Sequence, residues 1–303
     1  MLRLGIVDFD SSHSIEFTRR LNHAGVDSDQ FVDGARVELG WPGTSDMAPE
    51  RIAGFSELAA GCGVKLVDAP EKMLGHIDAV LVLSLCGQAH LGRVRPFLEA
   101  GIPAYVDKPF ACSLADAEQM LHLAEKHDTL LFHSSALWYA DEIERFRERR
   151  GDLGDLLGIV SYGPAKRAEG NPGLFHYGVH PTSILFALMG AGCEHVQNVH
   201  SDGAELVTGS WRDGRIATLR GSRRGSTAYG FLAFCEHGIV NQPVSARFAY
   251  RNLCREIVSS FTSNRPAVPH AMLLEITRFV LASLESESRG GDLVRLADVG
   301  REN

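Results

Sequence analysis

Short apolar strands alternate with amphipathic helices through the first 134 residues, and this alternation restricts the fold more than any other feature. Ala79–Leu85 is the strongest strand pattern, and Ser113–His127 repeats apolar residues at helical spacing. Strands that are joined through helices pair in parallel. The pattern predicts an α/β fold with a doubly wound parallel sheet, whose strands lie near residues 2–8, 35–39, 64–67, 79–85, 102–106 and 129–134.

The pattern changes after residue 134. Successive strand-like segments joined by glycine-rich or Asp-Gly turns favour a largely antiparallel sheet. These segments lie near residues 156–162, 196–200, 206–211, 216–221 and 229–235, with helices expected at 141–149, 181–189 and 269–284. We therefore divide the chain into a first domain of residues 1–134 and a second, α+β domain of residues 135–303, as the length also suggests.

The charge balance narrows the choice of partners. Lys and Arg total 30 against 38 for Asp and Glu, a net charge of −8, and no basic run is interleaved with aromatic residues. We therefore expect no nucleic-acid partner. The N-terminus lacks a signal-peptide pattern and no apolar run reaches bilayer length, so we expect a cytoplasmic protein without membrane contact. Six scattered cysteines without a Cys-x-x-Cys pair indicate neither a zinc knuckle nor a disulfide framework.

An acid, a lysine and a proline follow the strand expected at 102–106. Lys108 precedes Pro109, which biases the backbone of the lysine toward extended geometry. In open α/β sheets ligands bind at the carboxyl ends of the strands, where Asp107 and Lys108 stand. On spacing alone, a ligand-binding lysine and a solvated lysine in a surface turn are both open.

Three motifs along the chain resemble those of one enzyme family. Asp107-Lys108-Pro109 is similar to a Glu-Lys-Pro signature after the fifth strand, and His90 is similar to the histidine of a Thr-Pro-Asn-x-x-His turn. Residues 173–180, Gly-Leu-Phe-His-Tyr-Gly-Val-His, resemble a Gly-Gly-x-Leu-x-Asp-x-Gly-x-His segment. The chain is identified from these motifs as a divergent member of the glucose-fructose oxidoreductase, inositol dehydrogenase and MocA (Gfo/Idh/MocA) family, over essentially its whole length.

This resemblance implies a Rossmann domain that binds NAD or NADP, followed by a substrate-binding and oligomerisation domain with an open sheet. It implies hydride transfer to or from a carbinol of a polyhydroxylated, sugar- or cyclitol-like substrate, by a homo-oligomer such as a dimer or tetramer. The cofactor-binding positions that it implies are Phe9, Asp10, Ser11, Ser12, His13, Trp41, Ser84, Gln88, His90, Asp107, Lys108 and Pro109.

The expected cofactor turn departs from the family pattern. Where that pattern has Gly-x-Gly-x-x-Gly or Ala, this chain has Asp8, Asp10 and His13. Two carboxylates are then expected to face the pyrophosphate, and Asp10 is placed to cap the following helix. Either Ser11, Ser12 and backbone amides hold the cofactor differently, or it binds weakly or not at all.

The second strand leaves the choice between NAD and NADP open. A ribose-binding acid is expected about 20 residues past the turn. Here Glu38 lies inside the strand, and Gly40-Trp41-Pro42 follows it. Trp41 either stacks on an adenine or packs as a loop aromatic. The sequence therefore predicts a nicotinamide cofactor without indicating its 2′-phosphate preference.

His180 and Lys108 are the expected catalytic residues. Oxidation of a carbinol needs an acceptor for the hydroxyl proton, and histidine titrates near neutral pH. The resemblance gives that role to His180, and it gives Lys108 the stabilisation of negative charge on the reacting oxygen. His176 replaces a frequent aspartate four residues earlier, on the same helical face as His180, and orients or relays. A pair of backbone-satisfied histidines and a zinc pair without a marked third ligand are the alternatives.

Side chains of the second domain facing the strand ends are the expected substrate contacts, namely Tyr139, Tyr162, Lys166 and Arg167. The basic run 220–224 is expected to be a solvated turn, and no metal site is assigned. The loss of all three glycines also motivates an alternative function. That alternative is a family member without redox turnover, serving as a ligand-binding or regulatory protein or as a metal-assisted non-redox enzyme.

Overall fold

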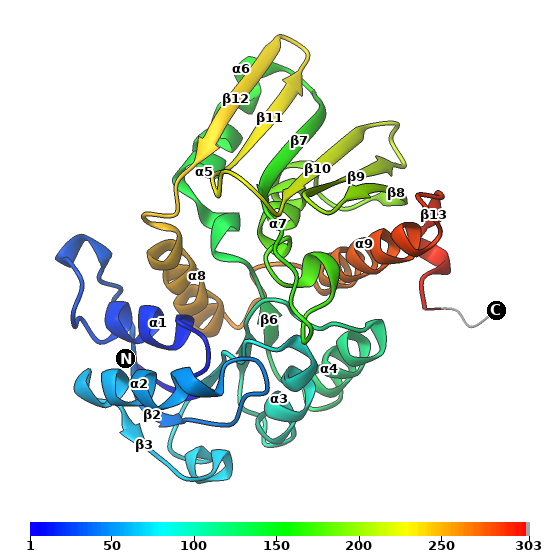
Figure 1. Ribbon diagram of the computed structural model, residues 1–303. Coiled ribbons are helices and arrows are strands. Elements are labelled where there is room, and N and C mark those ends of the chain that lie inside the picture. Colours follow the sequence, from blue (N-terminus) through cyan, green and yellow to red (C-terminus); the bar gives the residue numbers. More distant parts are fainter. Residues whose placement is uncertain (301–303) are drawn as a thin grey trace. The chain divides into compact units, whose positions relative to one another are not determined.

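Six parallel strands form one sheet, in the order β3-β2-β1-β4-β5-β6, in the computed structural model, which describes residues 1–300 (Figure 1). The chain runs outward from β1 to β3 and then returns to place β4 beside β1. The strand order therefore reverses between β1 and β4, the kind of switch point where doubly wound sheets bind ligands. The predicted parallel sheet is confirmed, with strands β1 (Leu2–Val7), β2 (Ala35–Trp41), β3 (Lys65–Leu66), β4 (Ala79–Val82), β5 (Ala104–Val106) and β6 (Leu131–His133).

The first compact unit takes in a helix from far along the chain. It comprises Met1–Cys112, Asp116–Ser134 and Tyr250–His270, whereas the sequence placed a single boundary between residues 134 and 135. Phe261 of the unpredicted helix α8 packs edge-on against Phe132 of β6, with ring centroids 5.2 Å apart. The helices of this unit are α1 (His13–Leu21), α2 (Pro49–Gly61), α3 (His90–Glu99), α4 (Leu114–Lys126) and α8 (Ala249–Ser263), with 3-10 turns η1 (Ser28–Gln30), η2 (Pro70–Met73) and η3 (Gly87–Ala89).

The second unit is built on a seven-stranded sheet in the order β12-β11-β7-β10-β9-β8-β13. β7 and β10 pair in parallel, and the other neighbours are antiparallel, so the predicted largely antiparallel sheet is confirmed. The sequence did not predict β12 or β13. The strands are β7 (Leu156–Pro164), β8 (Cys193–Ser201), β9 (Ala204–Trp211), β10 (Ile216–Ser222), β11 (Tyr229–Cys235), β12 (Gly238–Val244) and β13 (Val294–Arg295).

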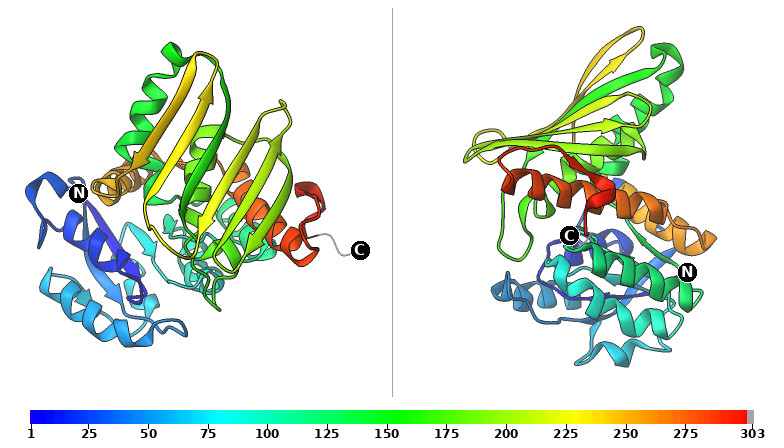
Figure 2. Two further views of the ribbon diagram at one scale, coloured as in Figure 1. Left: turned by 45° about the horizontal axis from the view of Figure 1, so that its top comes forward. Right: turned by 90° about the vertical axis from the view of Figure 1, so that its right-hand side faces the viewer.

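Helices cover one face of this second sheet. Phe186 of α7 packs against Trp211 of β9 and Phe279 of α9, with ring centroids 5.8 and 5.4 Å apart. Figure 2 shows α7 and α9 on that face, while the other face carries no helix among the described residues of the second unit. No helix within these residues has the length and apolar character needed to cross a bilayer. The helical elements are α5 (Asp141–Glu148), α6 (Arg150–Leu153), α7 (Val179–Met189), α9 (His270–Ser288), η4 (Ala136–Tyr139), η5 (Gly173–Phe175) and η6 (Leu296–Asp298).

Alanine substitutions at two glycines are expected to change the unfolding free energy in opposite directions. A Cβ on Gly158 of β7 would lie 2.2 Å from the carbonyl oxygen of Ile216 in the neighbouring strand β10. Neither backbone moves without breaking the ladder, so Gly158→Ala is expected to cost about 1–3 kcal/mol of unfolding free energy. Gly54 lies exposed inside α2, and a Cβ added there would meet no other atom within 4 Å, so Gly54→Ala is expected to stabilise by up to about 1 kcal/mol. Chemical denaturation measures both variants, and a Gly158→Ala protein as stable as wild type would contradict the strand register.

Candidate functional site

The turn between β1 and α1 begins with a buried acid in left-handed backbone. Asp8 has a φ of 69°, a conformation that aspartate adopts more readily than most side chains. Asp8 is 1% exposed, and its carboxylate accepts hydrogen bonds from Ser84 Oγ and, at 2.9 Å, from Arg93 Nε. Burial raises the pKa of Asp8, and these two partners oppose the shift. The expectation that Asp8 faces a bound pyrophosphate is wrong, because its carboxylate is turned into the protein.

The second acid of the turn is buried as well. Oδ1 of Asp10 accepts a 3.0 Å hydrogen bond from the backbone amide of Leu85, just beyond β4. The N-cap residue of α1 is Ser12, which makes no side-chain capping hydrogen bond. The prediction that Asp10 caps this helix is therefore wrong. Its carboxylate instead fastens the β1–α1 turn to the end of β4.

Arg93 of α3 connects the turn to the loop after β2. Besides Asp8, its guanidinium contacts Thr44, where Nη2 donates to the carbonyl oxygen at 3.2 Å and to the hydroxyl at 2.9 Å. The same guanidinium lies over the ring of Trp41, 4.6 Å from its centroid. Trp41 thus stacks on an arginine of its own unit. We did not predict Arg93 from the sequence. It lies three residues after His90, about one turn further along α3, and this spacing could have indicated that it lies near the same site.

The β1–α1 turn has no glycine at the three positions of the family pattern, but two glycines near the end of β2 lie against its side chains. A Cβ on Gly43 would lie 1.6 Å from Oδ1 of Asp8, and a Cβ on Gly40 would lie 2.6 Å from the ring of Phe9. Gly43 also has a φ of 71°, which favours glycine. Side chains of the turn therefore fill space that only glycine leaves free at the end of β2. Phe9 was predicted to contact the cofactor, but it is fully buried against Gly40 and presents no surface to a ligand.

His13 stands at the third glycine position and contacts an acid at the end of β5. Its Nδ1 lies 2.6 Å from Oδ2 of Asp107, and both side chains are buried. The imidazole is packed between the rings of Phe17 and Tyr250, with centroids 5.2 and 5.0 Å away. Burial alone raises the pKa of Asp107, but the nearby His13 and the Lys108 ammonium outweigh it and hold that pKa well below its usual range. The contact joins the β1–α1 turn to the strand end that carries Lys108.

Lys108 is 9% exposed, and its peptide bond to Pro109 is cis. Within residues 1–300, its ammonium has no hydrogen bond and no carboxylate within 4.0 Å, although it lowers the pKa of Asp107 through space. His90 is fully buried, with its two ring nitrogens 3.0 and 3.1 Å from the carbonyl oxygens of Ser84 and Phe110. His90 therefore fixes the loop after β5 against the end of β4, and it does not present its ring to a ligand as predicted.

The remaining predicted residues of the turn differ in exposure. Ser12 and Gln88 are exposed, whereas Ser11 is buried and its Oγ accepts a 3.3 Å hydrogen bond from the amide of His13. The backbone amides of Asp10, Ser11 and Ser12 donate to no acceptor in the described part of the chain. Three successive amide donors just before α1 therefore stay without an acceptor within residues 1–300, as an anion-binding turn requires.

In the second unit, His180 lies in the first turn of α7 beside residues from two other segments. Its Nδ1 is 3.0 Å from Oγ of Ser135, and its ring lies edge-on to that of Tyr229 of β11 with centroids 5.8 Å apart. His176 precedes α7, which begins only at Val179, so the expectation that both histidines share one helical face is wrong. Sequence reasoning missed Ser135 and Tyr229, because both are distant from His180 along the chain.

Tyr162 lies on the other side of the second sheet. Successive residues of a strand face opposite sides, and Gly163 of β7 faces Tyr229 and helix α7. Tyr162 therefore points to the uncovered face, where its hydroxyl oxygen lies 2.1 Å from the position that a Cβ on Gly230 would take. The sheet separates this predicted substrate contact from His180.

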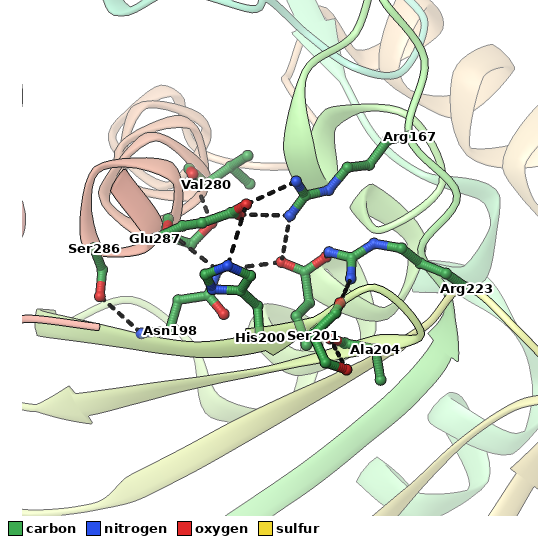
Figure 3. Close-up of polar contacts among 11 residues, drawn as sticks. Arg167, Asn198, His200, Ser201, Ala204, Arg223, Val280, Ser286 and Glu287 are labelled. Carbon is green, nitrogen blue, oxygen red and sulfur yellow. Dashed lines mark hydrogen bonds and ion pairs between the residues drawn. The ribbon is translucent and has the colours of Figure 1, made fainter. Parts of the chain in front are cut away.

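Arg167 belongs to a cluster of charged residues in the second unit (Figure 3). Its Nη1 donates at 2.8 Å to Glu287 of α9, and its Nη2 lies 3.8 Å from Glu205 of β9. Arg223 donates at 2.6 Å to the other oxygen of Glu205. Burial raises the pKa of Glu205 against both arginines, whereas the hydrogen bond from Arg167 lowers the pKa of Glu287. Arg167 is thus paired within its own unit, and Arg223, expected to be solvated with the rest of 220–224, is largely buried against Glu205.

The other predicted substrate residues are Tyr139, half-buried in η4, and Lys166, exposed after β7. Among residues 1–300, no three His, Cys, Asp or Glu side chains are grouped so as to hold a metal ion. His133 at the end of β6 is buried with its Nδ1 2.9 Å from the carbonyl oxygen of Val106. Burial lowers the pKa of His133 to about 4, so its imidazole is neutral at pH 7.

A family model supports the interpretation of the first unit. The model described as "Oxidoreductase family, NAD-binding Rossmann fold" (GFO_IDH_MocA) matches residues 45–134. The match begins after the β1–α1 turn, so it includes His90 and Lys108 but none of the residues that replace the glycines. None of the curated proteins matches the sequence significantly.

Solved structures resemble this chain along nearly its whole length. A myo-inositol dehydrogenase from Corynebacterium glutamicum has a TM-score of 0.80 at 15% identity, covering 98% of this chain and 99% of its own. A scyllo-inositol dehydrogenase from Lactobacillus casei, with NAD(H) and scyllo-inositol bound, has a TM-score of 0.79 at 16% identity and the same coverage. An oxidoreductase from Agrobacterium radiobacter, in complex with NAD+, L-tartaric acid and magnesium, has a TM-score of 0.77 at 14% identity, covering 98% of each chain. At these identities the likeness establishes the fold.

The contact between His13 and Asp107 is expected to stabilise the folded protein, and comparing a single variant with a double variant tests this. His13→Leu leaves the buried Asp107 carboxylate without the ring nitrogen that lies 2.6 Å from it, which is expected to cost about 1–3 kcal/mol of unfolding free energy. The double variant His13→Leu/Asp107→Leu buries no lone charge and is expected to be clearly more stable than the single variant. Urea unfolding followed by circular dichroism measures both. Equal stability of the single and double variants would show that His13 does not stabilise the Asp107 carboxylate.

Proposed function

Because residues 45–134 belong to the Gfo/Idh/MocA family of oxidoreductases with an NAD-binding Rossmann fold, we propose that this protein is an NAD(P)-dependent dehydrogenase acting on a carbinol. One observation carries the proposal furthest. The Lys108 ammonium is almost buried at the carboxyl end of β5 and has no protein acceptor in the described residues. Burying a cation without a partner is costly, which supports a role in holding a ligand oxygen.

Lys108 serves in this proposal as the donor to the reacting oxygen of the substrate. A bound nicotinamide supplies the hydride acceptor or donor, and the protein must stabilise the charge that builds on the carbinol oxygen. An ammonium in a site of low dielectric does this more strongly than in water. Asp107, held by His13, lies next to Lys108 and anchors the backbone that presents it.

His180 serves as the general acid/base. Ser135 contacts its Nδ1, which fixes the ring and leaves Nε2 as the second exchangeable position. The edge of Tyr229 packs against the same imidazole. His176 lies in the turn before α7 and serves as an orienting or relaying group. Tyr139 and Lys166 stay proposed as substrate contacts, whereas the position of Tyr162 on the uncovered face removes it from this group.

The proposed substrate is a polyhydroxylated compound of the sugar or cyclitol class. The fold is shared with a dehydrogenase whose structure carries scyllo-inositol and with an oxidoreductase whose structure carries L-tartaric acid, and both of these ligands are rich in hydroxyl groups. A second candidate, a family member without redox turnover, is favoured by the replacement of three glycines with Asp8, Asp10 and His13. Binding of NADH or NADPH to the purified protein separates the two candidates.

The uncovered face of the second sheet supports assembly into a homo-oligomer. Five exposed apolar side chains share that face by strand register, with exposures from 37% to 66%. They are Val199, Leu206, Ile216, Phe234 and Ile239. By register Ile216, Phe234 and Ile239 lie in one row and Val199 and Leu206 in another, and exposed apolar groups of this kind mark an interaction surface. Sedimentation velocity is expected to show a dimer or tetramer, and Ile216→Lys is expected to shift it toward monomer; a wild-type monomer would contradict the assembly.

Lys108→Ala and His180→Ala are each expected to lower kcat by about 100-fold or more while the proteins stay folded. The assay follows NADH or NADPH absorbance with a panel of cyclitols and aldoses. His122→Ala, an exposed histidine of α4, is the matched control and is expected to keep wild-type turnover.

Two results would overturn the proposal. Wild-type protein that binds neither NADH nor NADPH in fluorescence titration, and releases no dinucleotide on denaturation, is not a nicotinamide enzyme. Loss of folding in both alanine variants, seen by circular dichroism, would give Lys108 and His180 structural roles.

A further inference from the structure

We propose that Arg93 binds the phosphates of the nicotinamide dinucleotide, in place of the glycine-rich turn that this chain lacks. The inference rests on the proposed function and adds a residue that neither the family motifs nor the matched relatives assign. The ligand chemistry is that of a phosphate ester of the dinucleotide, either its pyrophosphate or the 2′-phosphate of NADP.

Two of the N–H donors of the Arg93 guanidinium are not used in hydrogen bonds within residues 1–300. A guanidinium carries five N–H donors. The Nε donor goes to Asp8, and the two Nη2 donors go to the carbonyl and hydroxyl oxygens of Thr44. The two Nη1 donors meet no acceptor among residues 1–300. The side chain is 23% exposed, so part of it is accessible to a ligand.

Arg93 is also in the right place for a phosphate. Asp8 follows β1, Ser84 follows β4, and Arg93 lies on the helix after β4, so the three side chains meet across the two strands where the sheet order reverses. Dinucleotides bind outside the strand ends at this switch point in doubly wound sheets. The partnerless amides of residues 10–12 lie in the same turn and add further donors for an anion.

The guanidinium is held before any ligand arrives. It is stacked on Trp41 at 4.6 Å and fastened by Asp8 and Thr44, so little side-chain freedom is lost on binding. Asp8 therefore acts as a positioning residue, and its charge is balanced by the arginine that it orients. This arrangement explains how a turn with acids in place of glycines remains compatible with an anionic cofactor.

A double-mutant cycle tests the inference by isothermal titration calorimetry with NADH and NADPH. Arg93→Met is expected to weaken binding by about tenfold or more, because a charged donor to phosphate is lost. Asp8→Asn is expected to weaken binding less than Arg93→Met does, because the amide oxygen of asparagine still accepts the hydrogen bond that orients Nε of Arg93. The double variant Asp8→Asn/Arg93→Met is expected to bind as weakly as Arg93→Met.

The competing explanation is that Arg93 only neutralises Asp8. In that case the double variant regains wild-type affinity, which overturns the inference. The double variant also guards against misfolding, since it leaves no unpaired carboxylate at the turn. Arg95→Met, on the same helix and paired with Glu99, is the matched control and is expected to leave both affinities unchanged.

The two cofactors identify which phosphate is held. A loss confined to NADPH assigns Arg93 to the 2′-phosphate, and equal losses for NADH and NADPH assign it to the pyrophosphate; both outcomes support the inference. Wild-type affinity in Arg93→Met overturns the inference alone. Absence of binding by the wild-type protein overturns the proposed function together with it.

Discussion

The hydrogen bond from Arg93 to Asp8 is the interaction on which the candidate cofactor site depends. It satisfies a buried carboxylate at the end of β1, orients a guanidinium at the switch point, and fixes the loop that carries Thr44. Without it, Asp8 would be a buried acid in left-handed backbone with only Ser84 as a partner. Burial of that charge costs more than one neutral hydrogen bond returns.

A second buried contact joins the same turn to the end of β5, next to Lys108. His13 replaces a glycine and reaches Asp107, the residue before Lys108. The turn after β1 is therefore tied to the end of β4 through Asp10 and Leu85, and to the end of β5 through His13. Each large side chain in the turn has a partner or a glycine opposite it, as Gly40 and Gly43 show. The side chains of the turn pack together as one unit. A single substitution within it is therefore expected to disturb the packing of the neighbouring side chains.

In the second unit, the surroundings of the candidate base His180 differ from those that the family pattern implies. The carboxylate that the family pattern places before His180 is absent, and the imidazole instead contacts a hydroxyl group, that of Ser135. A hydroxyl both donates and accepts, so it fixes the ring without adding negative charge. Arg167, Arg223, Glu205 and Glu287 form an ion-pair cluster that joins β9 and β10 to α9 (Figure 3). Of the basic run 220–224, the cluster takes up Arg223, whereas Arg220 and Arg224 are exposed.

The sequence by itself determined the parallel sheet, the mostly antiparallel second sheet and the place of Lys108 at a strand end. These features can be predicted because strand and helix periodicity, and the effect of a proline on the residue before it, depend only on residues that are close together in the sequence. It did not reveal that α8 packs in the first unit, where Phe261 meets Phe132, or that His176 lies outside α7. It also could not pair Asp8 with Arg93 or His13 with Asp107. These pairs are 85 and 94 residues apart, and only the folded chain brings such groups within hydrogen-bonding distance and removes the water that would otherwise solvate them.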